Sequence, residues 1–189
     1  MQISGKPDKH GVSATPARSP RQAREVLRDL ARQAEQEVMG VTMASMDELT
    51  LLSNRHGFTT LAQLALDACQ RLEVPATLLF FDLDDFKHIN YLYGRAEGDN
   101  ALKTFADVLR IAFRESDVIG RLGGDEFVAL LTGSNAVDLN AIKARLLEIL
   151  DERNATMRRG YDIRFSIGQI EFDAVAHRTV EELLENAKL

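Results

Sequence analysis

RLGGDEFVALL, residues 121–131, places two glycines and then two acids between two apolar runs. Each run has the length and composition of a short strand, and glycine supplies the positive φ angles that a tight turn between antiparallel strands requires. The stretch therefore predicts a β-hairpin with strands over 118–122 and 127–131. A turn alone does not need Asp125 and Glu126, and a core does not favour them, so the rest of the chain must show what they face.

A second group of acids follows the apolar run TLLFFDL, residues 77–83. This run lacks alternation and is short, which predicts a strand buried on both faces. The hairpin argues against a purely parallel sheet, so the expected fold class is α+β, with a mixed, mainly antiparallel sheet covered by helices. In such a sheet the end of strand 77–83 can lie beside the hairpin turn, which would bring Asp82 near Asp125 and Glu126.

Carboxylates that cluster in this way raise one another's pKa unless a cation lies among them. Mg²⁺ is the expected cation, because it prefers oxygen and is typically held by one or two carboxylates together with substrate phosphates. Such a site suits nucleotidyl transfer. The alternative is that Asp84 and Asp85 cap the turn after the strand and that Asp125 and Glu126 lie on a solvated hairpin; two acid clusters in one chain favour the site.

Helical periodicity appears in five further segments. The apolar stripe Leu27, Leu30, Ala34, Val38 and Val41 predicts a helix from about residue 20, and Thr179-x-x-Glu182 is a capping box that opens a last helix. A helix over 58–72 is expected to bury Phe58, Leu61, Ala65, Ala68 and Leu72. Helices are also expected over 100–113 and from 139 to 150, a strand over 164–172, and a loop containing Gly94 and Gly98.

The composition limits the class of protein. The chain has 189 residues, is 45% hydrophobic and carries a net charge of −6, which fits one domain with a real core and no general attraction to nucleic acid or anionic membranes. Its single cysteine, Cys69, excludes an internal disulfide and a cysteine-based zinc cluster. No apolar run is long enough to span a bilayer and the N-terminus has no signal-peptide pattern, so a cytoplasmic protein is expected.

Three regions are expected along the chain. Residues 1–19 have no apolar period and predict a disordered tail. Residues 20–46 predict a helical linker or stalk, which either packs on its own domain or pairs two copies as a short coiled coil. Residues 47–189 form the remaining domain.

The motifs in their order resemble the GGDEF family of diguanylate cyclases. RESDVIGRLGGDEF (114–127) is preceded by FDLDDFKHIN (81–90) and followed by FSIG (165–168), and DELTLLSNR (47–55) resembles the motif that opens the family's domain. The resemblance implies a βαββαβ core like that of nucleotidyl cyclases and polymerase palms. It also implies that two GTP molecules, one on each domain of a homodimer, are joined into cyclic di-GMP with release of pyrophosphate.

The resemblance also implies roles for individual residues. Mg²⁺ or Mn²⁺ would be bound by Asp82, the Leu83 carbonyl, Asp125 and Glu126, and Asp125 would help to deprotonate the 3′-hydroxyl. The remaining roles are phosphate contact by Lys87, Gly123 and Gly124, and guanine recognition by Asn90 and Asp99. Taken singly, Asn90 could be a turn residue, Lys87 a solvated charge and Asp99 the N-cap of a helix that starts near Asn100.

Arg114-x-x-Asp117 stands where the resemblance implies an inhibitory site for the product. Arginine suits this role because its guanidinium binds phosphate with two donors and stacks on guanine. The alternative is an i, i+3 ion pair on the surface at a helix end.

The chain departs from the family pattern at four places, two of which are Tyr91 after Asn90 and Arg95 after Gly94, residues with no expected part in the chemistry. Leu51 and Ser53 stand where glycine and proline are usual. The family's last helix usually continues into a stretch whose Lys and Arg hold the GTP phosphates, whereas this sequence stops at Leu189, with Lys188 where an Asp is usual. The resemblance therefore implies a C-terminally truncated domain with weaker GTP binding. Two alternatives stay open: a catalytically impaired module that binds GTP or cyclic di-GMP as a signalling receptor, and a cyclase for another nucleotide, which Asn90 and Asp99 make less favoured.

Overall fold

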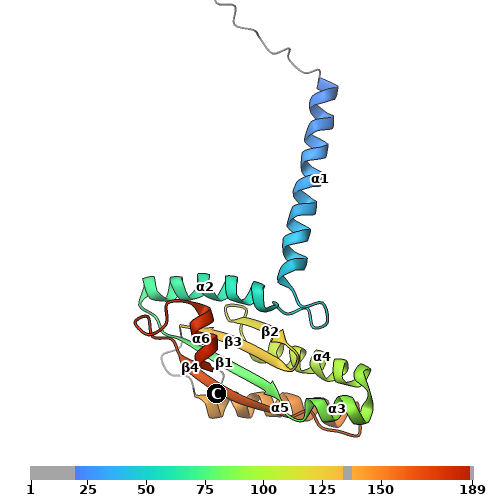
Figure 1. Cartoon of the computed structure of the whole chain (residues 1–189), viewed down its shortest axis with the longest axis vertical. Helices are drawn as coiled ribbons and strands as arrows, with labels where there is room; N and C mark the ends of the chain where they lie inside the picture. Colours follow the sequence, from blue (N-terminus) through green and yellow to red (C-terminus); the bar gives the residue numbers. More distant parts are fainter. Residues whose placement is uncertain (1–19, 134–137, 188–189) are drawn as a thin grey trace, which may run out of the picture. The chain divides into compact units, whose positions relative to one another are not determined.

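The structure is a computed structural model that describes residues 20–133 and 138–187 (Figure 1). The chain divides into two units, Met1–Gly40 and Val41–Leu189. The predicted disordered tail, residues 1–19, lies outside the described residues. None of the described helices is long and apolar enough to cross a membrane.

Helix α1, Pro20–Ser45, confirms the helix predicted from the apolar stripe. Several apolar side chains on it are exposed, including Leu30 at 54% and Val38 at 66%. A stripe of this kind leaves apolar area in contact with water in the single chain.

A four-stranded sheet forms the centre of the second unit, with the order β2-β3-β1-β4. Its strands are β1 Ala76–Leu83, β2 Val118–Gly123, β3 Glu126–Thr132 and β4 Phe165–Glu171. Every neighbouring pair in the sheet is antiparallel, which confirms the predicted hairpin and the mainly antiparallel fold. Because β1 lies beside β3 and antiparallel to it, the last residues of β1 lie next to the first residues of β3.

Helices cover both faces of the sheet (Figure 1). The helices are α2 Arg55–Leu72, α3 Phe86–Tyr93, α4 Arg95–Ala112, α5 Leu139–Met157 and α6 Val180–Ala187. Side chains alternate along β1, so Leu79 and Phe81 pack in the core under α4 and α5, whereas Leu78 packs in the core with α2 and α6. The prediction that β1 is buried on both faces is therefore confirmed.

Aromatic packing fixes the strand ends that carry the acids. The ring centroid of Phe105 lies 5.9 Å from that of Phe81 and 5.1 Å from that of Phe127, both in edge-on arrangements. Phe81 immediately precedes Asp82, and Phe127 immediately follows Glu126. Since neighbouring side chains on a strand point to opposite faces, burying the two rings turns the two acids away from this core.

Two expectations about the helices are wrong in part. A loop containing Gly94 and Gly98 is expected before residue 100, but Gly98 lies within α4, which begins at Arg95, and α3 precedes it. Phe58 is buried as predicted, but the rest of the buried face of α2 consists of Gly57, Ala62, Leu66 and Cys69, whereas Leu61 and Leu72 are 49% and 72% exposed. The side of α2 that lies against the sheet is set by packing, which periodicity among mixed alanines and leucines does not determine.

Leu51 adopts a left-handed backbone conformation, with φ +59°. This is the position at which the family resemblance implies glycine, the residue that takes positive φ without strain. The side chain is 62% exposed, so its own burial does not offset the strain.

Candidate functional site

The hairpin turn lies at the end of β1. Gly123 and Gly124 have φ angles of +141° and +52°, and a Cβ atom on either would meet nothing within 4 Å. Backbone conformation, rather than lack of space, is therefore what favours glycine at both positions. The Leu83 amide donates a hydrogen bond to the Asp125 carbonyl at 3.2 Å, which ties the turn to the last residue of β1.

Three of the predicted acids meet at this point. Asp82 is the register partner of Glu126, and Asp125 precedes Glu126 in the turn. Partial loss of water, and then the charges of Asp125, Glu126 and Asp84, raise the pKa of the Asp82 carboxyl. Because the Asp82 side chain is exposed to solvent, the like charges beside it are the main physical cause of the raised pKa.

The carboxylates of Asp82, Asp125 and Glu126, which we call the acid cluster, could bind a divalent ion that also contacts a substrate phosphate. Within the described ranges no three His, Cys, Asp or Glu side chains are arranged as a complete metal site. Mg²⁺ does not need one, because it commonly takes one or two carboxylates and completes its shell with water and substrate phosphates. A cation here would also relieve the repulsion that raises the pKa of Asp82.

Asp84 and Asp85 do not cap α3 with their side chains. The Asp84 carboxylate accepts a hydrogen bond from the Ser166 hydroxyl on β4 at 2.7 Å. Asp85 is the N-cap residue with φ +55° and makes no capping bond through its side chain. Both acids lie in the turn after β1, as the alternative expects, but Asp85 makes no side-chain capping bond to α3 and Asp84 joins the turn to β4.

Asn90 and Asp99 lie on either side of the junction between α3 and α4. Both are half-buried, and Asp99 stands in the second turn of α4, so it is not the N-cap of that helix. Lys87 is exposed on the first turn of α3, between Leu83 and Asn90. Helix α3 therefore leads from the acid cluster to Asn90. Asn90 lies about 6 Å further along the helix axis than the first residue of α3.

The side chain of Asn90 packs against Gly98. Its Oδ1 atom is buried without a hydrogen-bond partner, and a Cβ on Gly98 would stand 1.8 Å from it. The hydrogen that Gly98 carries instead points at Oδ1, as in weak Cα–H···O contacts. The Nδ2 donor of the amide lies farther from Gly98 and is left for another partner. Gly98 was expected to be a loop glycine, and its contact with Asn90 was missed.

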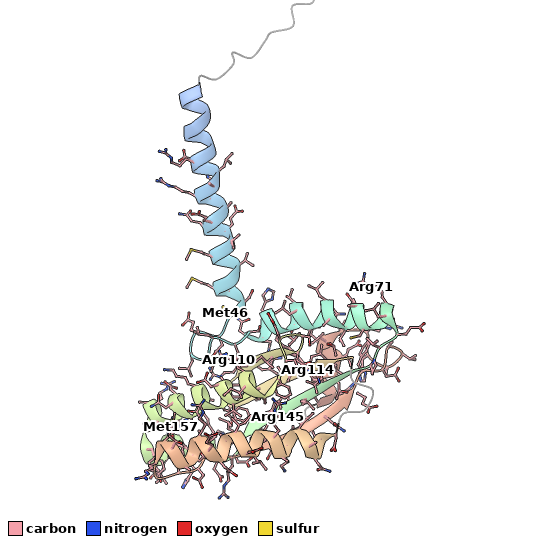
Figure 2. The ribbon with its side chains drawn as sticks, turned by 180° about the vertical axis from the view of Figure 1, so that it is seen from behind. Met46, Arg71, Arg110, Arg114, Arg145 and Met157 are labelled. Atoms are coloured by element: carbon pink, nitrogen blue, oxygen red, sulfur yellow. The ribbon has the colours of Figure 1, made fainter. Side chains whose placement is uncertain are left out.

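Arg114 and Asp117 form a turn rather than an ion pair. The Asp117 carboxylate accepts from the Arg114 backbone amide at 3.0 Å, and the Asp117 amide donates to the Arg114 carbonyl at 3.0 Å. No hydrogen bond or ion pair with another described residue involves the Arg114 guanidinium, which is exposed. Figure 2 shows Arg114 just past the end of α4, and Arg145 of α5 donates to the Ile111 carbonyl near the same end at 3.4 Å.

The turn between β2 and β3 is also held by an ion pair that the sequence did not predict. Arg121 lies 3.0 Å from the Asp47 carboxylate, and its Nη2 donates to the Gly124 carbonyl at 2.8 Å. Burial alone would raise the pKa of Asp47, but hydrogen bonds from Thr50 and Arg121 lower it below its usual value. The ion pair joins two residues 74 positions apart, a separation that no sequence period indicates.

Comparisons with known proteins point to one domain family. The family model described as the GGDEF domain of diguanylate cyclases matches residues 44–189. Over 126 residues the chain is 36% identical to the probable diguanylate cyclase DgcC of Escherichia coli K12, covering 67% of this chain and 34% of that protein. Over 147 residues it is 33% identical to the cyclic di-GMP phosphodiesterase NbdA of Pseudomonas aeruginosa PAO1, covering 78% of this chain and 19% of that protein.

Among solved structures, the coiled coil and GGDEF domain of DgcB from Caulobacter crescentus, in complex with c-di-GMP, has a TM-score of 0.75 at 23% identity. The alignment covers 88% of each chain. This likeness shows the fold, which confirms the predicted α+β architecture. The chain spans about a third or less of the length of the two curated relatives named above, and their names differ in activity, so the reaction has to be argued from the site.

Proposed function

Because this chain belongs to the GGDEF domain family of diguanylate cyclases, we propose that it condenses two GTP molecules into cyclic di-GMP. Each 3′-hydroxyl oxygen would attack the α-phosphorus of the other GTP, so that two P–O bonds form and two pyrophosphates leave. The observation that carries the proposal is the meeting of Asp82, Asp125 and Glu126 where β1 ends beside a glycine turn. Neighbouring acids at the ends of two inner strands repel one another, and binding a metal ion and phosphates gives them a role that the fold alone does not.

Several residues would share the chemistry. Asp125 would accept the proton of the 3′-hydroxyl, and Lys87 would place a positive charge near the phosphates. A Mg²⁺ or Mn²⁺ ion held by Asp82, the Leu83 carbonyl, Asp125 and Glu126 would neutralise phosphate charge. Gly123 and Gly124 leave open space on the turn, so a triphosphate could approach the backbone closely.

Asn90 and Asp99 would select guanine. A carboxylate can accept from both N1–H and the 2-amino group of guanine, and an amide NH₂ can donate to a purine acceptor. The Nδ2 group of Asn90 is the free half of its amide because Oδ1 is buried against Gly98. Adenine offers no N1–H donor and no 2-amino group, so the pair favours a guanine nucleotide.

The reaction would take place in a homodimer. Each domain supplies one acid cluster and one guanine site, whereas the product is made from two nucleotides. The apolar residues exposed on α1, which include Leu30 and Val38, support pairing of two copies through this helix. Assembly of the active enzyme would then depend on protein concentration.

A direct assay tests the proposed function. Protein incubated with GTP and Mg²⁺ is expected to yield cyclic di-GMP and pyrophosphate, which mass spectrometry identifies. The Asp125→Ala variant is expected to give only background, because it lacks the proton acceptor and one side of the ion site. Folded wild-type protein that gives no more product than this variant would contradict cyclase activity.

Product feedback is proposed at the Arg114 turn, since Asp117 fixes the Arg114 backbone just past the end of α4 and leaves the guanidinium exposed. Arg114→Ala is expected to lower the affinity for cyclic di-GMP roughly 10- to 100-fold, because hydrogen bonds to a charged group are lost. Calorimetry measures the change, and Arg178→Ala, at another exposed arginine, is the matched control. Equal affinity in wild type and Arg114→Ala would rule out this site, whereas tight product binding without turnover would favour the receptor alternative.

A further inference from the structure

A single residue joins the two helices that carry Asn90 and Asp99. Helix α3 ends at Tyr93 and α4 begins at Arg95, with Gly94 between them at φ +89°. A joint of one glycine leaves the angle between two helices weakly defined by the backbone itself. The spacing of Asn90 and Asp99 therefore depends on whatever else holds the helices together.

Residues 158–161, which we call the clamp segment, contact both helices. The Tyr93 hydroxyl at the end of α3 donates to the Gly160 carbonyl at 2.8 Å. The Tyr161 hydroxyl lies 3.1 Å from both the Glu97 carbonyl and the Glu97 carboxylate in the first turn of α4. The centroids of the two tyrosine rings lie 4.8 Å apart. Figure 1 shows α3 beside the end of α5 from which this segment leads.

The clamp segment is itself fixed to the core of the domain. Arg159 donates to the buried Thr104 hydroxyl on α4 at 2.8 Å. Just beyond the segment, the Asn154 side chain accepts from the Ile163 amide at 3.0 Å and donates to its carbonyl at 3.1 Å. A segment held at both ends can act as a rigid brace, because its own movement would break these bonds.

We propose that the clamp segment sets the spacing of Asn90 and Asp99, and that Tyr161 is therefore a positioning residue for guanine recognition. This proposal rests on the proposed function, in which these two residues bind the base. Tyr161 does not touch the base in this scheme; it acts through Glu97, which lies two residues before Asp99 on the same helix. Burial and the bond to Glu97 raise the pKa of Tyr161 to about 12, so its hydroxyl keeps its proton throughout the neutral range.

The test removes one hydroxyl group. Tyr161→Phe keeps the ring beside Tyr93 but loses the contacts with Glu97, so the Kd for GTP is expected to rise roughly three- to tenfold. Preference for GTP over ITP is expected to fall, because ITP lacks the 2-amino group that Asp99 would bind. Calorimetry with each nucleotide and Mg²⁺ measures both changes in the full chain. Tyr91→Phe is the matched control, since Tyr91 is 85% exposed.

The outcomes separate this proposal from the proposed function. Unchanged GTP affinity in Tyr161→Phe, or an equal loss for GTP and ITP, would overturn the positioning role, since a merely structural role affects both nucleotides alike. Glu97→Gln keeps an acceptor for the Tyr161 hydroxyl but loses the charge opposite Arg159, whose Nε lies 3.9 Å from the Glu97 carboxylate, so GTP affinity is expected to fall less than in Tyr161→Phe. A wild-type chain that binds GTP but forms no cyclic di-GMP contradicts the cyclase and leaves the binding test intact; one that binds no GTP contradicts both.

Discussion

Asp82→Asn is expected to abolish cyclic di-GMP synthesis while making the metal-free protein more stable. The substitution removes one carboxylate from the proposed ion site, so turnover should fall at least about 100-fold. It also removes the charge that Asp125, Glu126 and Asp84 repel. Activity and stability should therefore change in opposite directions, which simple misfolding of the variant cannot produce.

The pH dependence of stability follows from the sign of the same pKa shift. The folded protein raises the pKa of Asp82 above its usual 3.8, so the protonated group is the form that folding favours. The contribution to stability is complete below the unfolded pKa and is lost as the pH rises through the folded value. Metal-free wild type should thus lose stability across the acidic range relative to Asp82→Asn, and Mg²⁺ should restore it at neutral pH.

Thermal unfolding from pH 4 to pH 8, with and without Mg²⁺, measures these effects. Wild type should gain Tm with Mg²⁺ at neutral pH, and Asp82→Asn should gain less. Asp151→Asn is the matched control, because Asp151 is exposed on α5 away from the hairpin. An equal response to Mg²⁺ in wild type and Asp82→Asn would show that Asp82 holds no ion.

Gly98→Ala is expected to impair GTP binding while leaving the fold intact. The added Cβ would stand 1.8 Å from Asn90 Oδ1, so the amide must move out of its position. Losing the Asn90 contact to the base should weaken GTP binding roughly 10- to 100-fold. Stability should change little or rise by about 0.5–1 kcal/mol, because alanine is favoured over glycine within a helix and only a side-chain end is displaced.

Calorimetry with GTP and thermal unfolding measure the two effects of Gly98→Ala. Gly40→Ala is the matched control, since it makes the same change within a helix where a Cβ meets nothing within 4 Å. Wild-type affinity in Gly98→Ala would show either that Asn90 does not read guanine or that it does so from another position. Loss of both affinity and stability would instead indicate that Gly98 supports the fold.

The sequence determined the elements whose signals are local. Two glycines between apolar runs specified the hairpin, because positive φ is needed within the turn itself. The unbroken apolar run before Asp82 specified a strand covered on both faces, and Thr179 with Glu182 specified a helix start that the structure confirms through the bond from the Glu182 amide to Thr179 Oγ1. The position of Asp82 beside Asp125 and Glu126 was also predictable, because the end of one strand lies beside the start of its antiparallel neighbour.

The tertiary structure decided everything that depends on contacts between distant residues. The face that α2 buries depends on packing against the sheet, and the helical start of α4 at Arg95 lies against α3 and Tyr161; local periodicity contains neither contact. The contact of Gly98 with Asn90 appears only once α3 and α4 lie against each other. The bonds from Arg121 to Asp47 and from Tyr161 to Glu97 join residues 74 and 64 positions apart, and folding alone brings such partners within reach. The chemistry of the site was thus readable from residue types and order, whereas the contacts that hold its parts in position exist only in three dimensions.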